Sequence, residues 1–351
     1  AAQVNAGVVT SKGDDIVIST KSGLKVATAD GDKSFAVGGR IQWDYNRAEY
    51  QPAAGGDDVD ENDFGVRRAR IFTKGHHGDW GYKAQFNIGE DGADAGDVED
   101  LYITYNGWGS AAKVTIGRSK APFGLEELTS SKDISVLERG AATEAFAVGR
   151  AEGIKLTGKS GMFTYGFGAF EADDDDDKKD ADNLLAVGRV TAAPINDDGT
   201  VLHFGLGYQD SSEAGQGDLN DAMNLEVAGT IGSFHAQAEF FDGELMNGDS
   251  VDSYYVQAGW ILTGESRPYK DGKFKGVSSK EGAWELVARY TDGYGNYSDI
   301  ELPAEEGEAM TFGVNYYHNN IRIGATWMTG ENDATGDEGE EFRIRFQYVY
   351  N

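Results

Sequence analysis

Arginine and lysine side chains recur on one face of segments whose other face is apolar. Arg343 and Arg345, for example, alternate with Phe342 and Ile344. Guanidinium and ammonium groups bind oxyanions through charge-assisted hydrogen bonds, and rings of them line anion pores. The basic members of this face are Arg40, Arg68, Arg70, Lys83, Lys113, Lys155, Arg289, Arg322, Arg343 and Arg345. The fewer acidic members are Asp44, Asp100, Glu226, Glu239 and Glu285. The excess of cations predicts an anion-attracting surface, although any one of them could instead form an ion pair that holds the wall in shape.

A second group of cations belongs to the longest connection in the chain, residues 119–148, or to its entrance. This group is Arg118, Lys120, Lys132 and Arg139. These side chains could donate hydrogen bonds to a passing anion, or they could anchor the segment through neighbouring carboxylates. The predicted anion path therefore comprises Arg40, Arg68, Arg70, Lys83, Lys113, Arg118, Lys120, Lys132, Arg343 and Arg345.

Catalytic chemistry is not indicated. The sequence has no Gly-x-Ser-x-Gly elbow, phosphate loop or dinucleotide fingerprint, and its 5 histidines are dispersed. Carboxylate pairs carry no weight toward glycosidase chemistry, because pairs arise by chance among 60 acidic residues. We expect neither an enzyme nor a cofactor.

One acidic run could bind a hard cation. Its members are Asp173, Asp174, Asp175, Asp176 and Asp177. Carboxylates suit Ca²⁺ or Mg²⁺, which could also bridge such a loop to lipopolysaccharide. The run lacks the spaced ligands and turn glycine of a calcium loop, so a solvated surface loop is the favoured interpretation.

Composition narrows the class of protein. The chain has 351 residues, a formal net charge of −29 and no cysteine, which excludes a disulfide-stapled domain and argues against nucleic-acid binding. No apolar stretch approaches the roughly 18 residues of a membrane helix. Transmembrane strands, however, alternate lipid-facing and lumen-facing residues and keep mean hydropathy low. The opening Ala1-Ala2-Gln3 is what a mature exported chain would show.

Period-two alternation predicts many strands. Ile41 and Trp43 oppose Gln42 and Asp44, and runs of this kind recur between Gly, Asp and Asn clusters. The predicted strands are 35–48, 64–75, 79–89, 98–106, 112–119, 149–159, 161–171, 183–193, 200–209, 222–231, 233–242, 252–263, 283–291, 309–318, 320–329 and 341–350.

Connection lengths support a membrane barrel. Short turns alternate with long acidic loops, as in outer-membrane barrels, and only the connection 264–282 is too long for the short-turn end. The prediction is an all-β, 16-stranded antiparallel transmembrane barrel with long extracellular loops and an inward-folded third loop. A soluble β-sandwich is the alternative, because its strands alternate in the same way.

Longer motifs resemble a known family. They include Gly38-Gly39-Arg40-Ile41-Gln42, Arg67-Arg68-Ala69, Phe123-Gly124-Leu125-Glu126, Leu137-Glu138-Arg139, Leu262-Thr263-Gly264-Glu265-Ser266-Arg267-Pro268-Tyr269-Lys270 and the closing Phe346-Gln347-Tyr348-Val349. In this order, and over essentially the whole chain, they resemble the phosphate-selective porins O and P. The resemblance implies a trimeric outer-membrane porin of a Gram-negative bacterium, surrounded by lipid and lipopolysaccharide. It also implies passage of phosphate-like or polyphosphate-like anions through a channel narrowed by the third loop.

Three positions depart from the family pattern. Members that resemble this chain carry lysine where it has Glu127 and where it has Gly81, and an arginine-rich loop where it has residues 210–221. Each departure removes a feature that attracts phosphate. A general or cation-selective porin, or an adhesive barrel with acidic loops, therefore stays an alternative. We expect residues 1–34 to form an N-terminal periplasmic segment or arm and residues 35–351 to form the barrel.

Overall fold

The structure is a computed structural model. It describes residues 13, 15–20, 23–53, 59–89, 96–171, 184–197, 199–212, 219–295, 297 and 305–350. The acidic run 173–177 lies outside the described residues, as do parts of several long loops. Within the described residues, no helix is long and apolar enough to cross a membrane.

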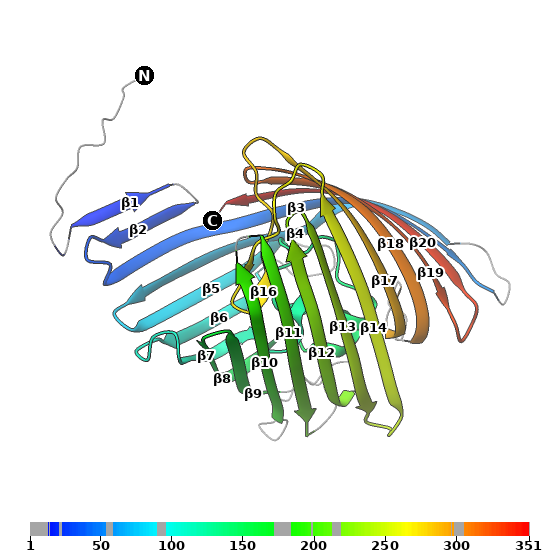
Figure 1. Cartoon of the computed structure of the whole chain (residues 1–351), viewed down its shortest axis with the longest axis horizontal. Helices are drawn as coiled ribbons and strands as arrows, with labels where there is room; N and C mark the ends of the chain where they lie inside the picture. Colours follow the sequence, from blue (N-terminus) through cyan, green and yellow to red (C-terminus); the bar gives the residue numbers. More distant parts are fainter. Residues whose placement is uncertain are drawn as a thin grey trace.

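Sixteen antiparallel strands form a closed barrel (Figure 1). They are β3 (Lys33–Gln51), β4 (Val59–His77), β5 (Trp80–Gly89), β6 (Val98–Tyr105), β7 (Lys113–Lys120), β8 (Arg150–Ser160), β9 (Phe163–Glu171), β10 (Leu184–Asp197), β11 (Thr200–Ser211), β12 (Leu219–Ile231), β13 (Phe234–Leu245), β14 (Ser250–Ile261), β17 (Ala283–Gly295), β18 (Glu305–His318), β19 (Ile321–Asn332) and β20 (Glu338–Tyr350). Each strand pairs with its neighbour in sequence, and β20 pairs with β3 to close the ring. The predicted barrel is confirmed.

The barrel is apolar outside and polar inside. On β11, Phe204 and Leu206 are 47% and 51% exposed, whereas His203 and Gln209 are 0% and 2% exposed. Aromatic side chains gather outside the short-turn end, where the rings of Trp80 and Tyr105 lie 5.1 Å apart. A soluble sandwich would bury its apolar face, so this inverted pattern decides for a membrane barrel.

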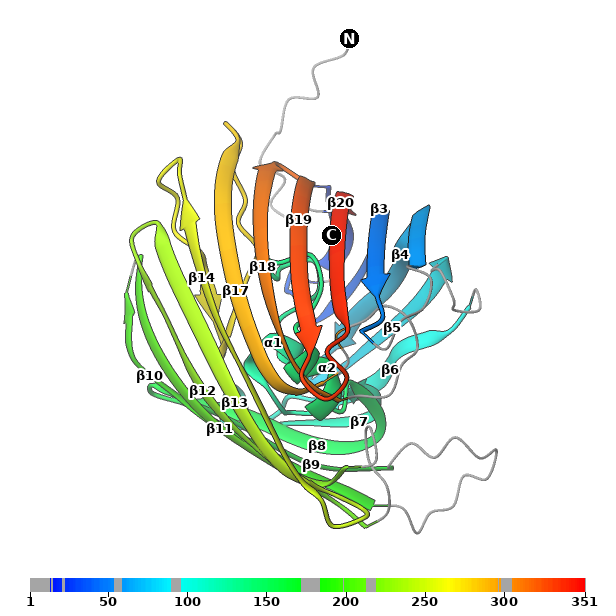
Figure 2. The same ribbon diagram turned by 90° about the vertical axis from the view of Figure 1, so that its right-hand side faces the viewer.

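One long connection fills part of the barrel from inside. This inward loop (residues 121–149) carries the short helices α1 (Leu125–Leu128) and α2 (Ala141–Phe146), which lie within the barrel in Figure 2. Phe146 is fully buried and stacks on Phe241 of β13, with ring centroids 5.3 Å apart. The predicted inward-folded third loop is confirmed, and its apolar side chains pack on the lumen face of the wall from β9 to β14.

A second segment enters from the short-turn end. This inward hairpin (residues 262–282) contains β15 (Tyr269–Lys270) and β16 (Lys273–Phe274). Its tip turns at Gly272, whose φ of +75° favours glycine, and Phe274 is fully buried. The sequence shows this connection to be too long, but its inward course was not predicted.

The N-terminal part extends the sheet beyond the ring. β1 (Ile16–Ser19) pairs with β2 (Leu24–Thr28), and β2 pairs with residues 34–37 of β3. The pairing of β3 with β20 starts only at Gly39, so this hairpin lies past the end of β20 (Figure 1). The hairpin of β1 and β2 thus projects from the short-turn end.

The two faces of β8 provide a test of this membrane fold. Leu156 points outward and is 37% exposed, whereas the next residue, Thr157, lines the lumen. We expect Leu156→Arg to lower the free energy of unfolding in lipid vesicles by about 2 to 4 kcal/mol, because a charge would then face lipid. The control Thr157→Arg should cost far less. Equal losses in urea titrations of the two variants would contradict the assigned faces.

Candidate functional site

A cavity of about 780 Å³ runs between the inward loop, the inward hairpin and the barrel wall. It is lined mainly from β3 to β9. Its described lining holds two aspartates, Asp100 and Asp271, against fifteen basic side chains. These are Arg40, Arg68, Arg70, Lys74, Lys83, Lys113, Lys120, Lys132, Arg139, Arg150, Lys155, Lys159, Arg189, Lys273 and Lys275. The open part of the lumen is therefore strongly basic although the whole chain is acidic.

A second cavity of about 500 Å³ continues toward the short-turn end. It shares Lys74, Lys83 and Lys113 with the first cavity and adds Lys25 of β2. Gly81 also lines it, and a side chain there would meet the Thr104 hydroxyl. The basic lining thus extends from the inward loop to the N-terminal hairpin.

Seven of the ten residues of the predicted anion path line the first cavity. They are Arg40, Arg68, Arg70, Lys83, Lys113, Lys120 and Lys132. Arg343 and Arg345 do not line it, although β20 lies beside β3 as barrel closure requires. That any of these side chains carries anions is still a prediction.

Arg118 was expected at the constriction, but it lies on the outer face of β7. Its neighbours Thr115 and Ser119 are buried and face the cavity, whereas Arg118 is in register with Leu101, which is 52% exposed. Its Nε donates to the Val98 carbonyl at 2.9 Å. The register with the outward-facing Leu101 therefore places this side chain outside the lumen.

Glu138 of the inward loop receives several arginines. Arg68 donates to its two carboxylate oxygens at 2.8 and 2.9 Å, and Arg345 donates to the same carboxylate. Arg343 and Arg67 also approach Glu138, at 3.5 and 3.2 Å. Burial alone would raise the pKa of Glu138, but Arg68 and Arg345 outweigh burial and hold that pKa well below its ordinary value. This carboxylate fastens the loop to β4 and β20, the two strands that flank β3.

The start of α1 is fixed to the opposite wall. Gly124 adopts a φ of +72°, which directs the next two backbone N–H groups toward Glu239 of β13. Leu125 and Glu126 donate to that carboxylate at 2.6 and 2.8 Å. The Glu126 side chain accepts from Arg289 and, at 2.8 Å, from the Thr143 hydroxyl. These contacts occupy the lumen face of β13 and β17.

The inward hairpin has its own anchors. Tyr269 and His203 form a hydrogen bond of 2.5 Å, and Arg189 donates to the Gly272 carbonyl at 2.9 Å. Arg267 reaches the inward loop, where it donates to the Asp133 carbonyl at 3.0 Å. The loop and the hairpin therefore support each other and close the half of the lumen behind them.

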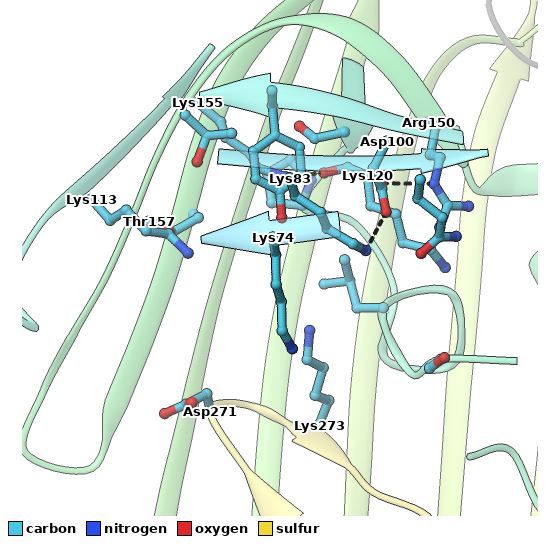
Figure 3. Close-up of a pocket in the computed structure, with 18 of the residues that line it drawn as sticks. Lys74, Lys83, Asp100, Lys113, Lys120, Arg150, Lys155, Thr157, Asp271 and Lys273 are labelled. Carbon is cyan, nitrogen blue, oxygen red and sulfur yellow. Dashed lines mark hydrogen bonds and ion pairs between the residues drawn. The ribbon is translucent and has the colours of Figure 1, made fainter. Parts of the chain in front are cut away.

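Carboxylates of β6 organise the remaining wall. Figure 3 shows Asp100 between Lys83 and Arg150, with distances of 2.5 and 2.9 Å. The adjacent Glu99 pairs with Arg150 at 2.8 Å and also with Arg70. These pairs hold the cations in place and reduce their net charge.

Other lining cations have no acidic partner. Among the described residues, no carboxylate lies within ion-pair distance of Arg40, Lys74, Lys113, Lys155 or Lys273. Lys74 and Lys273 extend toward one another from the wall and the hairpin in Figure 3. Burial, with Lys275, Arg189 and Lys113 nearby, lowers the pKa of Lys273 to about 8. This group supplies the uncompensated positive charge of the cavity.

Several lining residues were not part of the predicted path. They are Lys74, Arg139, Arg150, Lys155, Lys159, Arg189, Lys273 and Lys275. Lys155 was assigned to the lumen face, and alternation along β10 could likewise have found Arg189. Arg150 starts β8 in the phase of the outward Ile154, so alternation alone would have placed it outside. Lys273 and Lys275 belong to the hairpin, whose position depends on long-range contacts.

The Glu138 contacts predict how channel width is fixed. Glu138→Gln should weaken the inward loop by about 3 kcal/mol, because the buried side chains of Arg68 and Arg345 lose their anionic partner. We expect larger and noisier single-channel currents in planar bilayers, whereas Glu265→Gln, outside both cavity linings, should behave as the wild type. Currents of Glu138→Gln equal to those of the wild type would contradict this anchoring role.

Acid should reproduce this effect in the wild type. A carboxylate whose pKa is lower in the folded state than in the unfolded state stabilises the folded state at any pH above its unfolded-state pKa. This contribution is lost as the pH falls through the folded-state pKa. The contacts should therefore stay intact at neutral pH, and widening should begin only well below pH 4.5.

Comparisons with known proteins agree with this architecture. The family model described as phosphate-selective porin O and P matches residues 35–222 and 209–350. Porin O of Pseudomonas aeruginosa is 31% identical over an alignment 424 positions long, which covers 100% of this chain and 96% of Porin O.

Solved structures share the fold at low identity. The anion-selective porin of Comamonas acidovorans gives a TM-score of 0.59 at 16% identity and covers 91% of this chain and 100% of that porin. The trimer form of Vibrio cholerae OmpT gives a TM-score of 0.57 at 16% identity, with 91% and 99% covered. The predicted family and location are confirmed. The chain belongs to the phosphate-selective porin O and P family and is an outer-membrane porin of a Gram-negative bacterium.

Proposed function

We propose that this porin lets small anions, phosphate and related oxyanions among them, diffuse along the basic cavity without chemical conversion. The observation that carries the proposal is the charge of the cavity lining, with fifteen basic side chains against two aspartates. Charges in a narrow, protein-lined passage are screened less than charges on loops in salt solution. The lumen therefore outweighs the acidic exterior in setting ion preference.

The anion path runs along the cations that lack carboxylate partners. Arg40, Lys113 and Lys155 line the same cavity, so an anion can replace hydration water with their N–H groups. Lys83, Arg68 and Arg70 stand beside them, partly neutralised by Asp100, Glu138 and Glu99. The name of the Pseudomonas relative's family, phosphate-selective porin, supports an oxyanion as the solute.

The porin assembles with further copies of itself in the membrane. A similar solved structure, Vibrio cholerae OmpT, has a trimer form, which supports a homotrimer here. The apolar outer face contacts membrane lipid, and the long acidic loops face lipopolysaccharide. Residues 1–34 serve as a periplasmic arm, since β2 continues the sheet past the end of β20.

The test is the zero-current potential of the purified protein in a planar bilayer across a KCl gradient. We expect chloride preference in the wild type and a fall in chloride current when phosphate is added. The combined variant Arg40→Gln, Lys113→Gln and Lys155→Gln should shift the potential toward potassium, because it removes three cations without acidic partners.

Lys33→Gln is the matched control, since Lys33 is exposed at the short-turn end and lines neither cavity. Potassium preference in the wild type would reassign the chain as a general or cation-selective porin. Absence of any channel would favour an adhesive or structural barrel.

A further inference from the structure

Glu127 lies beside two of the cations that line the cavity. It belongs to α1 of the inward loop, and its side chain is 9% exposed. One carboxylate oxygen is 2.5 Å from the Lys120 ammonium, and the other is 2.8 Å from Nε of Arg139. Arg139 also donates to the Glu127 carbonyl at 3.3 Å. One negative charge is thus held within the basic wall.

This carboxylate differs from its neighbours in what it contacts. Glu126 accepts from Arg289 of β17, and Glu138 accepts from Arg68 and Arg345, so both fasten the loop to distant strands. Glu127 instead pairs with Lys120, which directly precedes the loop, and with Arg139, which lies within it. Its principal effect is therefore on charge, because it removes about half of the positive charge of the Lys120 and Arg139 pair.

Glu127 stays ionised at neutral pH. Burial acts to raise its pKa, but Lys120 and Arg139 outweigh burial and lower that pKa below its ordinary value. A fixed negative charge at the wall makes the local electrostatic potential less positive, which raises the electrostatic energy of every anion that passes. The energetic effect is proportional to the charge of the ion, so a divalent anion is penalised twice as much as a monovalent one.

We propose that Glu127 is a specificity-determining residue that weakens the binding of divalent oxyanions in the cavity relative to monovalent anions. The proposal deepens the anion-conducting function and rests on it. The proposal predicts a fixed relation between two fold-changes. When Glu127 is neutralised, the fold-change in affinity for a divalent anion must be the square of the fold-change for a monovalent anion. A purely structural role for this side chain would alter both classes of anion together, through a change in channel width.

The experiment compares the wild type with Glu127→Gln in planar bilayers. The probes are the zero-current potential in a KCl gradient and the sulfate concentration that halves the chloride current. With an ion about 8 Å away in a water-like dielectric, we expect about a 2.4-fold rise in chloride affinity and about a sixfold fall in the half-blocking sulfate concentration. Glu265→Gln, at the exposed short-turn end, removes the same charge outside the cavity lining and should change neither value.

Lys120→Gln is a second test that can be made even if Glu127→Gln does not yield folded protein. It removes a cation from the same group, so it must raise the half-blocking sulfate concentration. Unchanged sulfate block in Glu127→Gln, or equal shifts for sulfate and chloride, would overturn the proposal while leaving the porin anion-selective. Potassium preference in the wild type would contradict the proposed function. The difference in sulfate block between the wild type and Glu127→Gln would still test the role of Glu127.

Discussion

The ion pairs between carboxylates of the inward loop and arginines of the lumen wall determine the rest of this structure. Glu138 accepts from Arg68 and Arg345, and Glu126 accepts from Arg289. An empty barrel would leave these guanidiniums in water, so the loop satisfies them with its own anions. Their burial is stable only while both partners are present, because a lone buried charge is costly. The same ion pairs therefore fix the position of the loop and neutralise these arginines of the wall.

This arrangement divides the lumen. The loop and the hairpin enter from opposite ends and meet where Arg267 donates to the Asp133 carbonyl at 3.0 Å. Behind them, buried polar groups such as Asn224 and Glu285, both 0% exposed, pair with protein partners. In front of them, Arg40, Lys113 and Lys155 line the cavity, and no carboxylate among the described residues lies within ion-pair distance of these three side chains. The acidic net charge of the chain therefore does not describe its conducting path.

The sequence predicts the barrel well because alternation between lipid and lumen is a local property of each strand. The alternation of Ile41 and Trp43 with Gln42 and Asp44, for example, assigns each side chain to lipid or lumen from this one strand alone. Whether a lumen cation lines the path or anchors a loop depends on partners far away in sequence. Arg345 and the Leu137 carbonyl, for example, are 208 residues apart. The inward course of the hairpin likewise depends on Arg267 and Phe274 meeting the wall, which no local pattern reports.

The central claim is that ions follow only the half of the lumen that faces β3 to β9. The chain has no cysteine, so Thr157→Cys in the cavity and Thr230→Cys in the filled half, where Thr230 is 1% exposed, each introduce a single thiol. The most direct measurement is the bilayer current during exposure to an anionic methanethiosulfonate reagent. The account predicts rapid loss of current for Thr157→Cys and none for Thr230→Cys. Equal modification of both thiols would contradict it.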